Sequence, residues 1–328
     1  MSDAFAKLVR EIPQIGVDWH RETILENSKR MPRHHYYHTI RDIQPDSRPN
    51  AIVISAGPSL YRRDMIARIK ALDFRGPIIA IDGSYVQCLR AGLYPNFVLT
   101  LDPHPTRIVR WFGDPDFAAN SATDDYFARQ DLDESFRDDS AKQNAWNITL
   151  VDTLHPATKL VICCTSPANV VARTDKPTWT RYWFAPLVDN PKLPGSLTRE
   201  IAEITGLPSL NTGGTVGTAA VMFAHCVLKV KRIAVVGMDL GYAADMPLER
   251  TQSWNMLKDR KDVADLYPRV THPQWGECYT DPTYHFYKQG SLALLKSAGR
   301  TLFNCTEGGA LFGPHVECMN LEEWHGRR

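Results

Sequence analysis

A strand followed by a glycine turn and a helix, at residues 51–72, limits most what this chain can fold into. Residues 51–54 are apolar and mostly β-branched, which predicts a strand buried in a parallel sheet. Gly57 then lets the backbone turn sharply, Pro58 fixes φ, and Ser59 is placed to cap the helix. In doubly wound folds this first turn holds nucleotide phosphates. The alternative is a tight, well-capped turn without a ligand.

The same alternation recurs along the chain and predicts the fold class. Apolar runs typical of buried strands are followed by helix-like segments, and the strands end at small or acidic residues. These runs lie at 76–83, 96–102, 159–165, 233–237 and 300–304. We therefore predict an α/β, Rossmann-like fold with a mostly parallel sheet, helices on both faces and a ligand crevice at the carboxyl edge of the sheet.

The domain organisation follows from where this alternation of strands and helices begins and where it is interrupted. Residues 49–328 are predicted to form the Rossmann-like domain, with 1–48 as an N-terminal helical segment packed on it. Residues 113–146 are rich in Asp, Asn and Ser and predict a surface insertion. Residues 243–285 lack periodicity and form a candidate lid or substrate loop. The aromatic stretch 179–184 either walls a pocket or packs over the core.

Composition excludes several classes of function. A formal net charge of +1 over 328 residues argues against a dedicated nucleic-acid surface. No run reaches the roughly 18 apolar residues of a membrane helix, and the first residues lack a signal-peptide core, so a cytoplasmic location is expected. The 7 cysteines include no CxxC pair, which argues against disulfides and a cysteine-ligated zinc site.

A second glycine-rich block lies more than 150 residues after the first. Gly213 and Gly214 precede a helix rich in alanine, so this helix can pack closely and leave its N-terminal amides free for an anion. The next strand ends in Gly237 and Asp239. We predict that the two glycine turns line one crevice and share a phosphate site.

Three predicted strands deliver a carboxylate to the same edge of the sheet. Asp82, Asp102 and Asp239 stand where these strands end. Such carboxylates can gather to hold Mg²⁺ beside substrate phosphates, and we predict this metal site. The alternative role of each is to cap a helix or to form a turn.

Six blocks of the sequence, in their order, resemble a known family. They are GPSL at 57–60, Asp82-Gly83, LTLDPH at 99–104, NTGGTVGTAA at 211–220, VVGMDLGY at 235–242 and NCTEGGALFG at 304–313. Together they are similar to the central domain of bacterial motility accessory factors, which is grouped with archaeal 6-hydroxymethylpterin diphosphokinases. The first glycine loop and the GGT…GMDLGY pairing also resemble bacterial sialyltransferases that use CMP-sialic acid. The resemblance covers residues 49–313.

The resemblance implies a Rossmann-like transferase whose donor carries phosphate. The accessory factors are linked to transfer of pseudaminic or legionaminic acid, both sialic-acid-like sugars, to flagellin Ser or Thr. NCTEGG favours this glycosylating branch. The chain lacks the large flanking domains of the accessory factors, so the hydroxyl acceptor stays open: a glycan, a protein Ser or Thr, or a pterin. The substrate- or nucleotide-binding residues expected on these blocks are Gly57, Pro58, Ser59, Asp82, Gly83, Asn211, Thr212, Gly213, Gly214, Thr215, Gly237, Asp239, Tyr242, Glu307 and Gly308.

Transfer from a CMP-sugar needs phosphate stabilisation, a general base for the acceptor hydroxyl and exclusion of water. His272 and His285 are candidates for the base, because histidine titrates near neutral pH. Surface or packing roles are the alternative for both. Asp102 and His104 are candidates to bind Mg²⁺ or the acceptor.

Two other functions stay open from the sequence. One is transfer of diphosphate from ATP, with Mg²⁺, to 6-hydroxymethyl-dihydropterin. The sequence has no GxxxxGK[ST] loop, so ATP would need a different cradle. The other is a non-catalytic nucleotide-binding module, which predicts binding without turnover.

Overall fold

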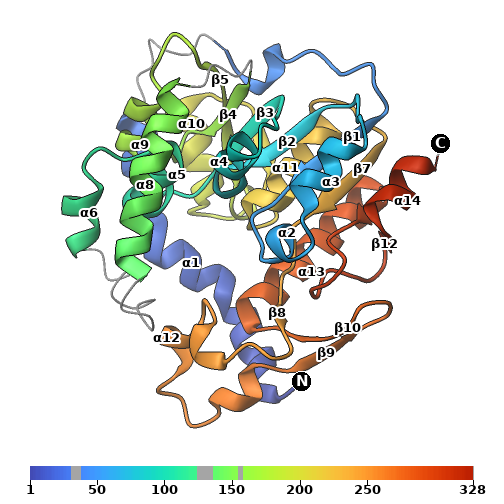
Figure 1. Cartoon of the computed structure of the whole chain (residues 1–328). Coiled ribbons are helices and arrows are strands. Elements are labelled where there is room, and N and C mark those ends of the chain that lie inside the picture. The colour runs from blue at the N-terminus through green and yellow to red at the C-terminus, as the bar shows by residue number, and fades with distance from the viewer. Residues whose placement is uncertain (31–37, 124–135, 154–157, 328) are drawn as a thin grey trace.

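The fold is built around one parallel sheet. The computed structural model describes residues 1–30, 38–123, 136–153 and 158–327, and Figure 1 shows helices packed around its sheet. The 9 strands lie in the order β12-β11-β7-β1-β2-β3-β4-β5-β6, and all of their pairings are parallel. The predicted α/β, Rossmann-like class is confirmed. The strands are β1 (Asn50–Ile54), β2 (Ile78–Ile81), β3 (Phe97–Thr100), β4 (Lys159–Cys163), β5 (Thr180–Leu187), β6 (Ser209–Asn211), β7 (Arg232–Val236), β11 (Leu302–Asn304) and β12 (Val316–Cys318).

The strand order reverses between β1 and β7. From β1 the chain adds β2 to β6 on one side, and then returns to place β7, β11 and β12 on the other side. Ile54 at the end of β1 pairs with Val236 at the end of β7, so the turns that follow both strands begin side by side. In open parallel sheets, such a reversal opens a crevice at the carboxyl ends of the strands, where ligands bind.

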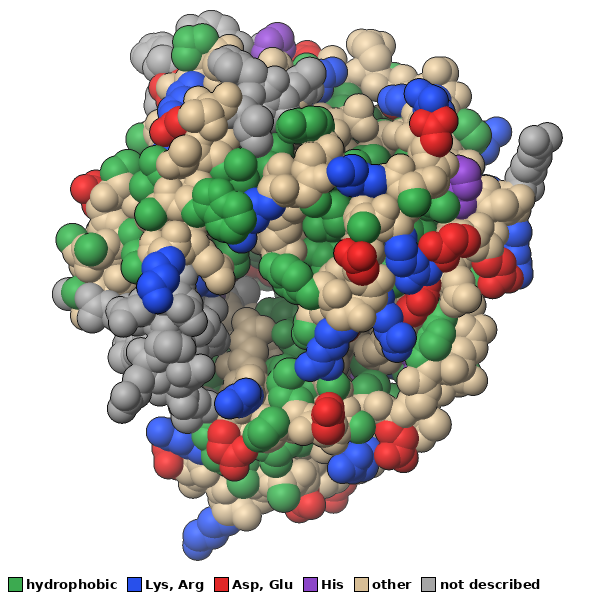
Figure 2. Space-filling model, viewed as in Figure 1, with side chains coloured by type: hydrophobic (Ala, Val, Ile, Leu, Met, Phe, Trp, Pro, Cys, Tyr) green, Lys and Arg blue, Asp and Glu red, His purple; other side chains and the backbone are tan. Residues whose placement is uncertain are grey.

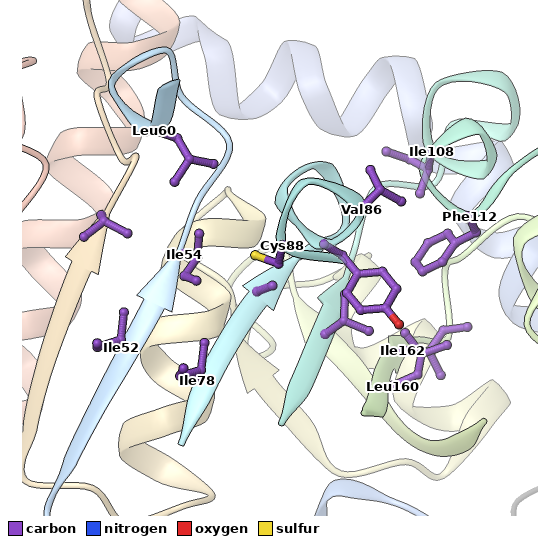
Figure 3. Packing of buried hydrophobic residues seen from close by; sticks show 14 of the residues in the cluster. Ile52, Ile54, Leu60, Ile78, Val86, Cys88, Ile108, Phe112, Leu160 and Ile162 are labelled. Carbon is purple, nitrogen blue, oxygen red and sulfur yellow. The ribbon is translucent and has the colours of Figure 1, made fainter. Parts of the chain in front are cut away.

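The core lies on both faces of the sheet because alternate strand residues point to opposite sides. Figure 3 shows one face, where Ile52 and Ile54 of β1 belong to the same buried cluster as Val86 of α4 (Asp82–Arg90) and Phe112 of α5 (Pro105–Phe112). On the other face, α11 (Val216–Cys226) packs on the sheet through Ala219, Ala220 and Ala224, all 0% exposed. The alanine-rich helix therefore packs as closely as predicted.

The helix predicted after the first glycine turn is interrupted. It forms two pieces, α2 (Ser59–Arg62) and α3 (Met65–Ala71), and Asp64 between them has a left-handed φ of 49°. The aromatic stretch 179–184 belongs mostly to β5, where Trp183 is 2% and Phe184 0% exposed. These side chains pack in the core, so the packing alternative holds for this stretch.

The N-terminal segment is a long helix, α1 (Asp3–Arg30), followed later by a short 3-10 turn, η2 (Ile40–Asp42). Helix α1 packs against α13 (Pro282–Ala298) and α10 (Leu197–Thr205). In Figure 1 it runs between the large sheet and a smaller sheet at the bottom of the view. No helix in the described ranges is both long and apolar enough to cross a membrane.

The segment predicted as a lid, 243–285, contains the smaller sheet, apart from Tyr242, together with its connections. Its strands are antiparallel in the order β8-β10-β9, so the segment is a folded unit and not an irregular loop. Phe5 of α1 packs into its apolar core beside Leu266 and Tyr279. Closure of this unit over a ligand stays a prediction. Its elements are β8 (Tyr242–Ala243), η3 (Leu248–Arg250), α12 (Trp254–Leu257), η4 (Val263–Leu266), β9 (Arg269–His272) and β10 (Gly276–Tyr279).

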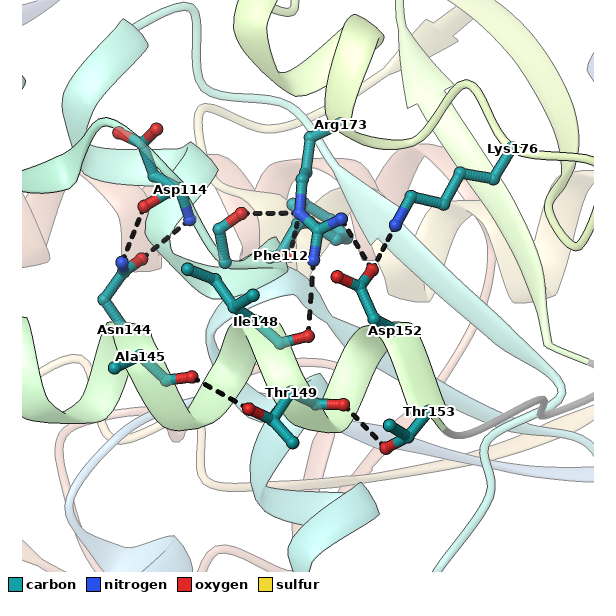
Figure 4. Close-up of polar contacts among 11 residues, drawn as sticks. Phe112, Asp114, Asn144, Ala145, Ile148, Thr149, Asp152, Thr153, Arg173 and Lys176 are labelled. Atoms are coloured by element: carbon teal, nitrogen blue, oxygen red, sulfur yellow. Dashed lines mark hydrogen bonds and ion pairs between the residues drawn. The ribbon is translucent and has the colours of Figure 1, made fainter.

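The segment predicted as a surface insertion, 113–146, contributes helices to the outside of the large domain. They are α6 (Phe117–Thr123) and the first part of α8 (Phe136–Thr153), while residues 124–135, with the acidic pair Asp124-Asp125, lie outside the described residues. Figure 4 shows how α8 is attached: Asn144 exchanges two hydrogen bonds with the backbone of Asp114, at 2.8 and 2.7 Å. Arg173, at the end of α9 (Ala168–Arg173), is paired with Asp152 at 2.7 Å.

Candidate functional site

A cleft of about 1220 Å³ lies along the carboxyl edge of the large sheet, beside the strand reversal. Figure 2 shows this side of the molecule hollowed between the large domain and the small sheet. The turns after β1, β3, β6 and β7 form one wall, and α1, α13 and the start of the small sheet form the others. Predicted site residues on its wall are Gly57, Pro58, Asp102, Asn211, Thr212, Gly213, Gly214, Thr215, Gly237, Asp239 and Tyr242.

The two turns at the strand reversal are in direct contact. The Gly57 amide donates to the Gly237 carbonyl at 2.8 Å, and the Ser59 hydroxyl donates to Oδ2 of Asp239 at 2.7 Å. Ser59 therefore does not cap a helix as predicted: the N-cap of α2 is Pro58, and it makes no side-chain cap bond. Because α2 has only 4 residues, it contributes little dipole, and the role of Ser59 is to orient Asp239.

Asp239 is a half-buried carboxylate in the wall of the cleft. Burial raises its pKa above the usual range, while the hydrogen bonds from Ser59 oppose this shift. A Cβ added at Gly57 would lie 2.1 Å from Oδ2 of Asp239 and 2.6 Å from the Gly237 carbonyl oxygen. Glycine is thus required at position 57 by its own neighbours in the protein.

The second glycine block reaches the same cleft from the turn after β6. Gly213 and Gly214 have left-handed φ values of 58° and 86°, and Thr215 caps α11 by accepting the Thr218 amide. A Cβ at Gly213 would approach Thr218 of α11 to 2.6 Å and Leu294 of α13 to 2.9 Å, so this turn is also packed closely. The structure brings both glycine turns to one cleft, while their binding of phosphate stays a prediction.

The three predicted metal carboxylates do not gather. Within the described ranges no group of three or more His, Cys, Asp or Glu side chains is placed to hold a metal ion, so the cluster prediction is wrong. Asp82 is 4% exposed, accepts from the Thr100 hydroxyl at 2.9 Å and from the Gly83 amide at 2.7 Å, and does not reach the cleft. Burial raises the pKa of Asp82 to about 7.

Asp102 is the one of the three carboxylates that is exposed, and it lies in the cleft wall. Its Oδ1 accepts the amide of His104 at 2.8 Å, while the second carboxylate oxygen has no hydrogen bond to another described residue. His104 is the N-cap residue of α5 and does not belong to the cleft wall. Gly83 lies close to Ala56, at 3.0 Å from an added Cβ, and serves packing.

The two histidines predicted as general bases occupy different surroundings. His285 packs edge-on against Phe5 with ring centroids 5.3 Å apart, and it lines neither this cleft nor the pocket beside it. His272 is 3% exposed, and its Nδ1 accepts the amides of Gln274 and Trp275 at 3.0 and 3.2 Å. The proton of the neutral ring is therefore on Nε2, which makes His272 a hydrogen-bond donor and not a base.

Tyr242 and Asp281 form a buried polar group next to the cleft. Asp281 is not among the site residues predicted from the sequence. The Tyr242 hydroxyl donates to Oδ2 of Asp281 at 2.7 Å, and the Ser253 hydroxyl donates to the same oxygen at 2.5 Å. Asp281 is 0% exposed and also caps α13 by accepting the Tyr284 amide. Burial raises the pKa values of both Asp281 and Tyr242, so Tyr242 stays protonated and joins the small sheet to α13.

Glu307 and Gly308 line a smaller pocket next to the cleft, together with His272. The Glu307 carboxylate accepts from the Arg68 guanidinium at 2.6 Å, and Arg68 is also paired with Glu322. This ion-pair network attaches the loop after β11 to α3 and α14 (Leu321–Gly326). Glu307 is thus engaged in a contact within the protein.

Several cleft residues were missed from the sequence. On α1, four residues at intervals of four line the cleft: Ile12, Gly16, His20 and Ile24. This spacing is a signal the sequence did hold, since residues at i and i+4 share one face of a helix. Arg250 and Gln252 lie in the connections of the small sheet, where the sequence has no periodic pattern that would predict their position.

Comparison with known proteins finds a family model that matches part of the chain and a solved structure with a similar fold. The model of the 6-hydroxymethylpterin diphosphokinase MptE-like family matches residues 22–117. This range runs from α1 through β1, β2 and β3 into α5 and includes Gly57, Ser59 and Asp102. No curated protein matches the sequence.

Among solved structures, the chain is similar to the MAf glycosyltransferase from Magnetospirillum magneticum AMB-1, with 17% identity and a TM-score of 0.52. The match covers 93% of this chain and 39% of that one, so the chain spans about two fifths of the length of that protein. The predicted resemblance to the motility accessory factor and 6-hydroxymethylpterin diphosphokinase group is therefore confirmed, by the family match at residues 22–117 and by a fold shared over most of the chain.

Proposed function

We propose that this protein is a nucleotide-dependent glycosyltransferase that moves a sialic-acid-like sugar from a CMP donor to a hydroxyl acceptor. The observation that carries the proposal is the single cleft at the strand reversal, walled by both glycine turns, Gly57 and Gly213-Gly214. Its volume of about 1220 Å³ is large enough for a nucleotide together with a sugar. The shared fold with a MAf glycosyltransferase supports the same class of reaction.

In this proposal the second glycine turn holds the donor phosphate, because in the first turn the Gly57 amide already donates to the Gly237 carbonyl and Pro58 has no amide hydrogen. The Gly213 and Thr215 amides donate within the turn, to Oδ1 of Asn211 and to the Thr212 carbonyl, so the Gly214 amide just before α11 provides the donor for the negative charge that develops on the leaving CMP. Asp102 is an exposed carboxylate in the wall, at the end of β3, and takes the proton of the acceptor hydroxyl. Helix α1 and the small sheet limit access of water to the cleft.

Diphosphate transfer from ATP to 6-hydroxymethyl-dihydropterin is the second candidate. The family match over residues 22–117 favours it, because this range holds the first glycine turn and Asp102. This reaction would use Mg²⁺, for which Asp102 is one exposed carboxylate in the cleft, and substrate phosphates would complete the coordination. The two reactions release different nucleotides, CMP and AMP.

The test is to incubate the purified protein with CMP-pseudaminic acid and hydroxyl acceptors, and separately with ATP, Mg²⁺ and 6-hydroxymethyl-dihydropterin. We expect acceptor-dependent release of CMP. An Asp102→Asn substitution keeps the oxygen that accepts the His104 amide, and we expect at least about tenfold slower turnover with an unchanged unfolding midpoint. Asp73→Asn, at a side chain 76% exposed near the opposite edge of the sheet, is the matched control.

AMP release that depends on the pterin would replace this proposal with the diphosphokinase. Nucleotide binding with no turnover in either reaction would favour a binding module. Equal turnover by wild type and Asp102→Asn would remove Asp102 from the mechanism, whatever the donor.

A further inference from the structure

A second pocket opens beside the main cleft, on the other side of the turn after β1. Its volume is about 140 Å³, several times the roughly 10–15 Å³ that one water molecule needs but far below that of the main cleft. Pro58, Asp239 and Tyr242 belong to the walls of both. A ligand bound in the cleft can therefore extend a small group into this side pocket.

One wall of the side pocket holds a buried donor without a partner. His272, 3% exposed, is fixed by the two amides on its Nδ1 and by the Trp275 ring, whose centroid lies 4.5 Å from its own. Its Nε2, on the other side of the ring, is buried and has no hydrogen-bond partner among the described residues. Burial and, second, Lys288 lower the pKa of His272, so the ring is neutral and Nε2 carries a proton to donate. A buried donor without an acceptor is unfavourable, which favours a ligand that accepts its hydrogen bond.

The opposite wall holds two arginines with free donors. Arg62 and Arg63, at the end of α2, are exposed, and neither guanidinium has an ion pair or hydrogen bond to another described residue. The acidic residues of the pocket are in contact with other groups: Glu307 with Arg68 at 2.6 Å, Asp239 with Ser59 at 2.7 Å, and Glu277 with Arg269 at 3.5 Å. Arg62 lies near the Asp239 carboxylate and opposes the rise of its pKa, whereas Arg63 has no acidic partner among the described residues. Guanidinium groups bind carboxylates and phosphates through paired hydrogen bonds.

We propose that the side pocket is an oxyanion subsite, in which Nε2–H of His272 and the guanidinium groups of Arg62 and Arg63 hold a carboxylate or phosphate group of the substrate. Its size and position suit one such group attached to a larger ligand in the cleft. For a CMP donor of the proposed kind this group is the sugar carboxylate, an identification that rests on the proposed function. Binding of the anion itself does not depend on it.

The test is isothermal titration of the full chain with inorganic phosphate and, separately, with N-acetylneuraminate, at constant ionic strength set with chloride. The methyl ester of N-acetylneuraminate, which has no charge, is the matched ligand. His272→Asn keeps an acceptor for the Gln274 and Trp275 amides but removes the Nε2 donor. We expect at least tenfold weaker anion binding for His272→Asn and for the double variant Arg62→Gln/Arg63→Gln.

Arg75→Gln is the control, because this arginine is 81% exposed and precedes β2 at the opposite edge of the sheet. It should bind like the wild type, and the unfolding midpoints of all variants should agree. Tighter binding of N-acetylneuraminate than of phosphate assigns the pocket to a carboxylate, and the reverse order assigns it to a phosphate. Absence of anion binding by the wild type, or equal binding by the wild type and the double variant, overturns the proposal.

The outcome separates this proposal from the proposed function. If CMP release depends on the acceptor but the substitutions do not change anion binding, the proposed oxyanion subsite is contradicted and the proposed glycosyltransferase function is not. Anion binding that is lost in the variants, with no release of CMP or AMP in any reaction, contradicts the glycosyltransferase alone.

Discussion

At the scale of single residues, the first glycine turn shows how a correct prediction can rest on an incomplete reason. The sequence predicts that Gly57 leaves room for a ligand. In the structure the space beside its Cα is occupied by Asp239 and by the carbonyl of Gly237, so this glycine is needed for the turns after β1 and β7 to touch. Gly308, also predicted as a site residue, has nothing within 4 Å of an added Cβ.

These two glycines give a matched pair of substitutions. Gly57→Ala forces Asp239 or the backbone at Gly237 to move, and overpacking of this kind costs about 1–3 kcal/mol. Gly308→Ala should change the free energy of unfolding by less than about 0.5 kcal/mol. Urea denaturation of both variants and the wild type measures the difference. Equal, small effects would show that the two turns are not in contact as described.

The sequence predicts that aspartates stand at the ends of three strands, but it does not predict which residues their carboxylates contact. Asp82, Asp102 and Asp239 all stand where the sequence places them, at the ends of β2, β3 and β7. Asp82 faces Thr100 inside the sheet, and Asp239 faces Ser59, because the pairing of neighbouring strands decides which way each side chain points. Strand pairing depends on residues far apart in the sequence. The residues around each aspartate therefore could not show whether the three carboxylates meet at a metal site.

At the scale of elements, hydrophobic periodicity identified the strands that are buried on both faces. The expected runs contain β2, β3, β4, β7 and β11, all inside the sheet. The strands that were missed have other patterns: β5 is aromatic and contains Pro186, β6 and β12 have only 3 residues each, and β8, β9 and β10 are short and antiparallel. Short half-exposed strands carry too few buried positions for a period to be recognised.

Helix α1 supports the small sheet, and one side chain carries much of this contact. Phe5 is 1% exposed and packs with Leu266, Tyr267 and Tyr279. Phe5→Ala should reduce the free energy of unfolding by about 3–5 kcal/mol, or unfold the small sheet alone if it opens before the large domain. Hydrogen exchange of amides in 242–281, compared with that of β1 to β4, distinguishes these outcomes.

Leu193→Ala is the control for this contact, since Leu193 is 56% exposed and lies away from α1's apolar contacts with the small sheet. It should leave exchange in 242–281 unchanged. Unchanged exchange in the Phe5→Ala protein would mean that the small sheet is stable without α1.

At the scale of the whole molecule, the cleft is shared by three parts of the chain. The carboxyl edge of the large sheet supplies the glycine turns, α1 supplies the face with Ile12 and His20, and the connections of the small sheet supply Arg250 and Gln252. The sequence predicts the first part, because parallel strands have a common carboxyl edge. The contributions of α1 and of the small sheet cannot be predicted from the sequence. Tertiary packing decides which of their faces lie toward the carboxyl edge of the large sheet.

This arrangement predicts that a bound nucleotide stabilises all three parts together. A ligand at 100 times its dissociation constant raises the free energy of unfolding by about 2.7 kcal/mol. We expect CMP to raise the unfolding temperature more than ATP, UDP or GDP, and to slow hydrogen exchange in residues 57–59, 213–215, 12–24 and 248–252. Ile12 and Arg250 lie far apart in sequence, so their joint protection requires a ligand in the cleft described here. Protection confined to one part would place the nucleotide elsewhere, and a larger shift with ATP would favour diphosphate transfer over transfer of a sugar.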